Sequence, residues 1–179
     1  MIKPQRGVLS IVSIAEKKLA PAGRPVKTSM ANTYTQLYIQ IVFAVKGREN
    51  LISKEHKEEL QKYITGIVQQ RNCKLIAIHC MPDHCHILVG LRPDIPLSDL
   101  VRDIKANSSK FIKDKEWVRG NFEWQEGFGA FSYAHSQLQD VIQYILNQEE
   151  HHKKRTFKEE YLAFLEKFEV EYNEKYLFS

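Results

Sequence analysis

The amino-acid sequence predicts an α+β fold built on an antiparallel sheet. Segments with period-2 hydrophobicity alternate with segments of helical period, in the order strand, helix, strand, strand, helix, strand. Two further helical segments follow. The 179 residues suit one domain, and a hydrophobic fraction of 43% suffices for a sizeable core. No apolar run approaches about 18 residues, so we expect no membrane-spanning helix.

The first 29 residues differ in character from the rest of the chain. They hold six basic residues and one acidic residue, so the net charge of +4 resides mainly in this segment. Met30 directly precedes the first clear strand. We expect residues 1–29 to be a basic leader that is disordered or not translated, and residues 30–179 to form the functional domain. Serines interrupt the short apolar stretch of the leader, which disfavours a signal peptide.

The first half of the domain predicts a strand, a helix and a hairpin. Residues 33–45 alternate in the manner of a long, half-buried strand. Residues 54–71 repeat apolar side chains at helical spacing. Residues 74–80 form a second strand, and a Pro-Asp turn leads into a third strand that ends near Leu91. The last two strands therefore predict an antiparallel hairpin.

The second half predicts helices around a segment of short strand pieces. A helix over 97–114 precedes an aromatic segment, 121–134, in which we expect strand pieces and a loop. A capping box at Ser136 predicts a helix over 137–151, and another at Thr156 opens a last helix. The order is that of a ferredoxin-like β-α-β-β-α-β fold with helices on one face of the sheet, plus the C-terminal helices.

Two histidines stand two positions apart at the start of the third strand. Side chains at i and i+2 of a strand share a face, so His84 and His86 lie roughly 6.5–7 Å apart at their Cα atoms and can converge on one ion. Cys85, Ile87 and Val89 point to the opposite face and are expected in the core. A metal or phosphate role and a pair of hydrogen-bonded, half-buried histidines both fit this local pattern.

The helix over 137–151 carries a tyrosine outside its apolar stripe. At about 100° per residue, Tyr144 lies roughly 130° from the centre of that stripe, and Gln148 follows one turn later on the same side. Packing of Tyr144 against another element is the alternative. The stripe consists of Leu138, Val141, Ile142, Ile145 and Leu146.

With these motifs in place, residues 33–168 resemble the HUH-type single-tyrosine transposases of short bacterial insertion sequences and their relatives, the REP-associated tyrosine transposases. The HUH motif (His, hydrophobic residue, His) is HCH at residues 84–86, inside MPDHCHILV, with a cysteine as an unusual middle residue. The second motif is YILNQ at 144–148. The segment WQEGFGAF at 124–131 also looks like that family.

The resemblance implies a metal-dependent DNA transposase. Tyr144 is the implied nucleophile, which cleaves a phosphodiester to give a 5′-phosphotyrosine and a free 3′-hydroxyl, followed by strand transfer. The implied metal ligands are His84, His86 and Gln148, with Mg²⁺ or Mn²⁺ as the metal; two imidazoles also suit zinc or cobalt. The energy of the broken bond is kept in the phosphotyrosine, so no ATP is needed.

The resemblance also implies the partners. Members of the family act on single-stranded DNA and recognise hairpins near element ends. We expect a homodimer, although the REP-associated relatives can be monomers. Three cysteines without framework spacing favour a reducing, cytoplasmic setting. The candidate phosphate contacts are Arg48, Lys105, Lys110 and Lys153.

Three alternatives remain open at the level of sequence. A non-catalytic module that binds single-stranded nucleic acid on a ferredoxin-like sheet would need neither Tyr144 nor a metal. A structural zinc site would use Cys80 and Cys85 with the two histidines, although Cys85 faces away from them. An inactive transposase would retain the motifs and lack a substrate.

Overall fold

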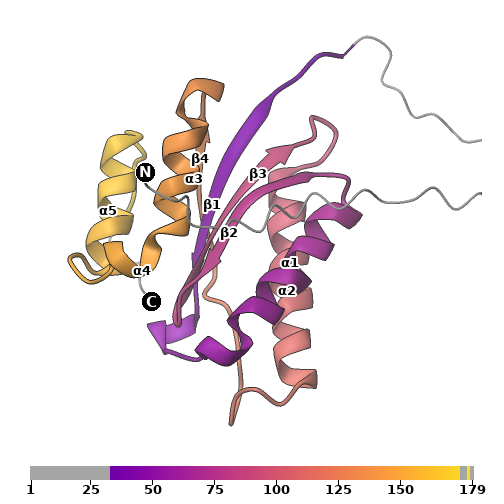
Figure 1. Cartoon of the computed structure of the whole chain (residues 1–179), viewed down its shortest axis with the longest axis vertical. Coiled ribbons are helices and arrows are strands. Elements are labelled where there is room, and N and C mark those ends of the chain that lie inside the picture. The colour runs from indigo at the N-terminus through magenta and orange to yellow at the C-terminus, as the bar shows by residue number, and fades with distance from the viewer. Residues whose placement is uncertain (1–32, 174–176, 178–179) are drawn as a thin grey trace, which may run out of the picture. The chain divides into compact units, whose positions relative to one another are not determined.

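A four-stranded antiparallel sheet is the centre of the fold (Figure 1). The structure, a computed structural model, describes residues 33–173 and residue 177, so the expected leader lies outside the described residues. The strand order is β2-β3-β1-β4, and each neighbouring pair is antiparallel. This is the predicted ferredoxin-like topology. The strands are β1 (Leu37–Ala44), β2 (Lys74–Cys80), β3 (His84–Leu91) and β4 (Gly129–Tyr133).

The two helices of the ferredoxin-like unit lie on one face of this sheet, as predicted, and the C-terminal helices lie on the other (Figure 1). One face carries α1 and α2, and the other carries three shorter helices. Those three helices direct both apolar and polar side chains toward the sheet. The polar side chains form the site described below. The helices are α1 (Lys54–Gln70), α2 (Leu97–Asp114), α3 (Leu138–Leu146), α4 (Gln148–His151) and α5 (Phe157–Lys167).

The expected helix over 137–151 is broken in two. A short 3₁₀ turn, η2 (His135–Gln137), precedes α3, and the chain leaves helical geometry at Asn147, where φ is −96° and ψ is 21°. The predicted cap at Ser136 is wrong, because Gln137 Oε1 instead accepts a hydrogen bond of 2.9 Å from the Ala134 N–H. The second predicted cap is confirmed: Thr156 Oγ1 accepts from the Glu159 N–H at 3.3 Å and opens α5.

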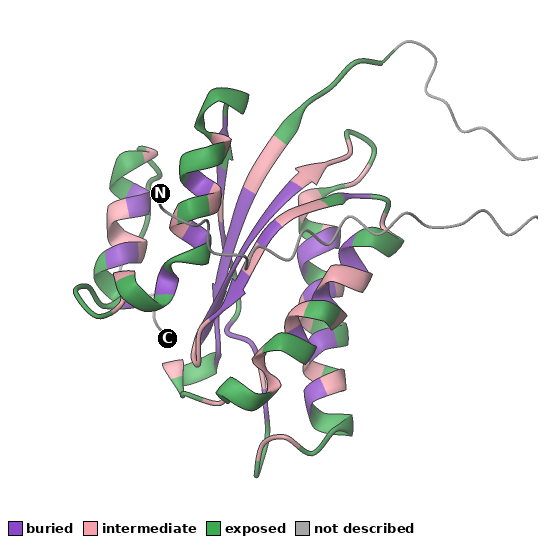
Figure 2. Ribbon diagram, in the orientation of Figure 1, coloured by how far each residue is buried: buried purple, intermediate pink, exposed green. Residues whose placement is uncertain are grey.

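The two faces of the sheet hold separate cores (Figure 2). The larger core lies under α1 and α2 and takes Cys85, Ile87 and Val89 from β3, as the alternation predicts. The aromatic segment contributes mainly to these cores rather than to the surface: Phe122, Trp124 and Phe131 are each at most 7% exposed. The strand pieces expected there are β4 and an isolated bridge between Val45 and Trp124.

The structure also removes the alternative of a structural zinc site. Cys80 and Cys85 are Cα partners across β2 and β3, and their Sγ atoms lie 2.7 Å apart in the core under α1 and α2. That core is on the opposite side of the sheet from the two histidines. The thiols and imidazoles therefore cannot share one ion. Within the described residues, no helix combines the length and apolarity that crossing a membrane requires.

Candidate active site

The two histidines of β3 lie side by side under the three shorter helices, as the strand period predicts. His84 is 1% exposed and His86 is 0% exposed, and their ring centroids are 5.1 Å apart. The Nε2 atom of each ring is buried without a hydrogen-bond partner among the described residues. Burying such a polar atom unpaired is costly, so these two nitrogens are candidates for binding a ligand.

The Pro-Asp turn before β3 orients the first histidine. His84 donates from Nδ1 to Asp83 Oδ1 at 2.6 Å, which leaves the lone pair on Nε2. Arg48, from the 3₁₀ turn η1 (Lys46–Arg48), ion-pairs with the other oxygen of Asp83 and stacks on Phe157, with its guanidinium carbon 3.9 Å from the ring centroid. Arg48, expected to contact DNA phosphate, thus has an internal partner that holds the turn in place.

The second histidine is oriented from the neighbouring strand. Gln40 of β1 is fully buried, and its amide nitrogen lies 3.1 Å from His86 Nδ1. The amide oxygen of Gln40 accepts a hydrogen bond of 2.9 Å from the Tyr133 hydroxyl on β4. Three strands of the sheet therefore contribute to the position of one imidazole.

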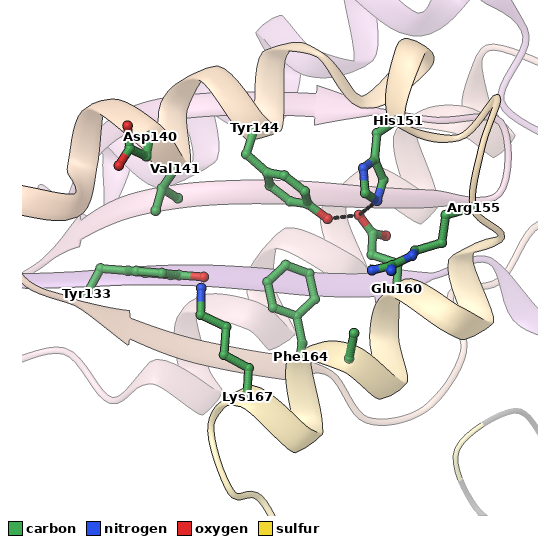
Figure 3. Close-up of a pocket in the computed structure, with 10 residues that line it drawn as sticks. Tyr133, Asp140, Val141, Tyr144, His151, Arg155, Glu160, Phe164 and Lys167 are labelled. Carbon is green, nitrogen blue, oxygen red and sulfur yellow. Dashed lines mark hydrogen bonds and ion pairs between the residues drawn. The ribbon is translucent and has the colours of Figure 1, made fainter.

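Tyr144 reaches the same place from α3. Its ring centroid lies 6.1 Å from that of His86, and its hydroxyl donates a hydrogen bond to Oε1 of Glu160 on α5 (Figure 3). The tyrosine is half-buried. Tyr144 therefore packs inward against α5 and the sheet while its hydroxyl lies in a polar cluster, and both motifs of the sequence meet within one chain.

Gln148 follows Tyr144 by one turn and is fully buried. Its Nε2 donates to Glu160 Oε1 at 3.0 Å, and its Oε1 is buried with no hydrogen-bond partner in the described part of the chain. The apolar stripe predicted for this helix was displaced: Leu146 is 50% exposed, whereas Val141, Ile145 and Gln148 form the buried face. Those three positions follow the i, i+4, i+7 spacing of one helical face.

Two site residues were missed at the level of sequence. Glu160 and His152 join His84 and His86 in a group whose ligand atoms all lie within 4.8 Å of one another. His152 follows α4 in the basic run HHKKR at residues 151–155, a composition that usually indicates a solvated segment. Glu160 was overlooked beside the capping Glu159, although a carboxylate between the inward positions of Phe157 and Phe164 is a usable signal.

The cluster combines an ionised carboxylate, Glu160, with a neutral imidazole, His84. Burial opposes ionisation of Glu160, but the adjacent imidazoles of His152 and His86 outweigh burial and lower the pKa of this carboxyl. Burial, and then the charge of Glu160, raise the pKa of Tyr144. Burial lowers the pKa of His84 to about 4. The tyrosine is therefore a protonated donor at neutral pH, and His84 is neutral, the form that binds metals.

A cavity of about 330 Å³ opens beside the tyrosine (Figure 3). Its wall includes Tyr144 and Glu160 together with two cationic side chains, Arg155 and Lys167. Lys167 also lies over the ring of Tyr133, with Nζ 5.9 Å from the centroid. The cavity gives an anionic group a path to the tyrosine hydroxyl.

The remaining candidate phosphate contacts lie away from this cluster or at its rim. The Lys105 ammonium donates to the backbone carbonyls of Gln125 and Gly127, the latter at 2.7 Å. Lys110 is exposed on α2. Lys153 is exposed next to His152 and pairs with Glu150 at 2.6 Å. The structure therefore brings Tyr144, His84, His86 and Gln148 together, and does not bring these lysines to them.

Curated proteins resemble this chain over most of their own length. The ISDra2 transposase TnpA of Deinococcus radiodurans is 24% identical over 120 residues, which cover 63% of this chain and 84% of the relative. The transposase for insertion sequence element IS200 of Salmonella typhimurium is 23% identical over 128 residues, covering 68% of this chain and 84% of the relative.

Two solved structures share the fold. A candidate transposase from Deinococcus radiodurans R1 superimposes with a TM-score of 0.51 at 24% identity, over 65% of this chain and 94% of that one. A REP-associated tyrosine transposase bound to a REP hairpin gives 0.52 at 18% identity, over 67% of this chain and 71% of that one. The sequence pattern of the IS200-like transposases matches residues 33–148, and the chain belongs to that family of DNA-processing enzymes.

Proposed function

We propose that the protein is a metal-dependent transposase of single-stranded DNA with Tyr144 as its nucleophile. The observation that carries the proposal is the meeting of Tyr144, Gln148 and the two histidines in one buried cluster. A tyrosine hydroxyl beside unpaired imidazole nitrogens, at the wall of an accessible cavity, is suited to attack on a phosphodiester. Membership of the family supports the same reaction class.

The donor set fits a divalent metal. His84 and His86 would hold it through their unpaired Nε2 atoms, and Gln148 through its unpaired Oε1. We propose Mg²⁺ or Mn²⁺ as the ion. When bound, the ion supplies a Lewis acid that withdraws charge from the phosphate oxygens.

The reaction follows from the position of the tyrosine. The Tyr144 oxygen attacks phosphorus, a bond forms between them, and the bond from phosphorus to the 3′ oxygen breaks. The tyrosine hydroxyl gives up its proton and the released 3′ oxygen gains one. Glu160 aims the hydroxyl before attack. The phosphotyrosine retains the energy of the broken bond, so the 3′-hydroxyl can attack a second phosphotyrosine without ATP, which completes strand transfer.

The proposed substrate is DNA with a hairpin near each element end. The REP-associated relative was solved with a REP hairpin, which supports a hairpin here. Arg155 and Lys167 at the cavity wall, with Lys153 and Lys110 on the exposed surface, are the cations best placed for phosphates. Arg48 and Lys105 would have to leave internal partners. Three buried free cysteines support a cytoplasmic setting.

The contacts of Tyr144 support a site assembled within one chain. Tyr144 lies beside the histidines of its own β3, so a second subunit is not needed to assemble the cluster. We retain the homodimer as a proposal about assembly on DNA rather than about the chemistry. Light scattering with and without a hairpin oligonucleotide tests it, and one chain per complex at saturating protein would refute it.

The decisive experiment is a search for the covalent intermediate. Purified protein, Mn²⁺ and single-stranded DNA from both flanks of its own locus are resolved on a denaturing gel, with Tyr144→Phe and a chelator as the two tests. The matched control is Tyr63→Phe, which removes the hydroxyl of a tyrosine stacked on Phe111 at the other face of the sheet. We expect an adduct in the wild type and in Tyr63→Phe only.

Either outcome is informative. An adduct that Tyr144→Phe abolishes identifies the nucleophile and the reaction class together. Binding of both flanks without any adduct would refute the mechanism and favour the non-catalytic binding module or an inactive transposase.

A further inference from the structure

The family pattern ends at Gln148, but two residues after it have side chains in the cluster around His84 and His86. His152 lies beyond the end of α4 and Glu160 lies on α5, both outside the matched residues 33–148. Glu160 is nevertheless 2% exposed and contacts Tyr144. These two residues contribute side chains to the site that the family pattern does not describe.

We propose that His152 and Glu160 are metal ligands alongside His84 and His86, and that Glu160 joins the metal to the tyrosine by using one oxygen for each. The inference rests on the proposed function and extends it. Gln148 keeps its proposed place as an oxygen ligand. The C-terminal segment thereby becomes part of the active site.

The first argument is the pattern of unpaired atoms. The ligand atoms of the four residues lie within 4.8 Å of one another. Nε2 of each of the three histidines and Oε2 of Glu160 are buried without a hydrogen-bond partner among the described residues. Oε2 lies 3.3 Å from Nε2 of His86 and 3.3 Å from Nε2 of His152, without the geometry of a hydrogen bond. A shared cation satisfies all four atoms at once.

The second argument is the tautomer that the surroundings impose on the rings. His152 Nδ1 lies 3.0 Å from the backbone oxygen of Arg155, and because a carbonyl only accepts, Nδ1 carries the proton. His84 is fixed in the same way by Asp83. Both rings therefore turn an Nε2 lone pair toward Glu160. Metal-bound histidines usually donate their other ring nitrogen to a carboxylate or a carbonyl in this manner.

His86 also gains an Nε2 lone pair if the side-chain amide of Gln40 is rotated by 180°. As drawn, the Gln40 amide nitrogen faces His86 Nδ1, which places the ring proton on Nε2. Turning the amide by 180° presents its oxygen to Nδ1 and its nitrogen to the Tyr133 oxygen, and this frees Nε2. The Tyr133 hydroxyl can reverse its role because it both donates and accepts. Gln40 is thus a positioning residue that permits either form of His86.

The two oxygens of Glu160 have separate surroundings. Oε1 accepts from the Tyr144 hydroxyl and, at 3.0 Å, from the Gln148 amide. Oε2 faces the imidazole nitrogens of His86 and His152. One carboxylate can therefore bind a metal and hold the nucleophile at the same time, which fixes the distance between them.

The ligand set selects a class of metal. Three imidazoles with one carboxylate suit Mn²⁺, Co²⁺, Fe²⁺ and Zn²⁺, whereas Mg²⁺ prefers oxygen ligands and its own waters. We therefore expect Mn²⁺ and Co²⁺ to bind the full-length protein at least about 10-fold more tightly than Mg²⁺. This narrows the proposed choice between Mg²⁺ and Mn²⁺ toward the transition metal.

The experiment is a calorimetric titration of the full chain with Mn²⁺, followed by the visible absorption spectrum of bound Co²⁺. His152→Ala and Glu160→Gln should lower Mn²⁺ affinity by more than about 100-fold, the upper end of effects from outer-shell partners, and should change the Co²⁺ spectrum. The controls His135→Ala and Glu166→Gln alter the same residue types at exposed positions and should bind like the wild type. Circular dichroism establishes that each variant is folded.

The outcomes separate the two proposals. If the wild type binds Mn²⁺ and both ligand variants bind it like the controls, while Gln148→Ala does not, the added ligands are refuted and the proposed function stands. If the wild type binds no divalent metal, the metal-dependent function fails and the added ligands fail with it. Loss in both ligand variants, with intact controls, supports the inference. His152 is only partly buried, so its variant remains a valid test if Glu160→Gln does not fold.

Discussion

The two faces of β3 bury different kinds of side chain: one face is apolar, and the other carries two histidines. Toward α1 and α2 the strand presents Cys85, Ile87 and Val89, all fully buried in an apolar core. Toward α3, α4 and α5 it presents His84 and His86, equally buried, whose Nε2 atoms have no hydrogen-bond partner within the described part of the chain. Equal burial therefore has different energetic consequences, because apolar burial stabilises the fold and unpaired polar burial destabilises it.

The difference teaches where stability and function reside in this molecule. The face under α1 and α2 resembles an ordinary core whose loss unfolds the domain. The opposite face holds a polar cluster whose cost of burial a bound ligand would offset. The apolar core around that cluster is smaller and is interrupted by it. Substitutions at successive positions of one strand should separate the two properties.

The largest effect is expected for His86→Ala. Removing one of the two proposed strand ligands should lower cleavage by at least about 10³-fold, which is about 4 kcal/mol of transition-state stabilisation. The thermal midpoint should change little, because the lost ring is an unsatisfied polar group. Adduct formation on a denaturing gel and a thermal melt measure the two quantities. The control is His79→Ala, a buried histidine on the neighbouring strand outside the ligand group, and equal loss in both variants would contradict the assignment.

Ile87→Ala changes the next position and the opposite face. It should lower the free energy of unfolding by about 3 kcal/mol, within the range for a fully buried isoleucine, through lost burial and a residual cavity. Urea denaturation measures this effect. Mn²⁺ affinity of the folded fraction should equal that of the wild type, and a weakened affinity would show that the two faces are coupled.

Gln40→Met tests whether the hydrogen bond from β1 to the His86 ring orients that ring for metal binding. The substitution keeps the approximate volume and removes the partner of His86 and of the Tyr133 hydroxyl. We expect metal affinity to fall by about 10- to 100-fold, as is typical of outer-shell partners. Tyr133→Phe, which removes only the far end of this chain of contacts, should cause a smaller decrease, and the reverse order would disprove the proposed orientation of His86.

The smallest effect is expected for Thr156→Ala at the start of α5. Loss of the cap should cost about 1 kcal/mol of stability. Because α5 carries Glu160, fraying of its first turn should lower Mn²⁺ affinity slightly. Thr156→Ser, which keeps the hydroxyl, is the control in the same urea denaturation. A loss of stability in Thr156→Ser as large as that in Thr156→Ala would argue against capping.

The sheet could be predicted from sequence because the alternation of apolar and polar residues identifies the strands and the face on which each side chain lies. The alternation of β1 and β3 specifies which residues face which side, so the histidines and Cys85 were assigned to opposite faces correctly. The same pattern does not state where the predicted C-terminal helices pack, so it left open that α3 and α5 cover the second face of the sheet.

The site was predicted only where its residues belong to a recognisable motif. The helix face of Tyr144 was misjudged because Leu146 is apolar and yet half-exposed, which shifted the apparent stripe. Glu160 is one acidic residue among several near the start of α5, and its burial follows from tertiary contacts with His86 and Tyr144 that no local pattern encodes.

The placement of Glu160 beyond the family pattern has a consequence for the order of synthesis. Tyr144 and Glu160 are 16 positions apart, and ribosomes add about 5–20 residues per second, so the proposed nucleophile emerges on the order of one second before the carboxylate to which it donates its hydrogen bond. On the proposed function, a growing chain that has already made the tyrosine motif therefore lacks part of the machinery for breaking DNA. Cutting would begin only after α5 has been made and has docked.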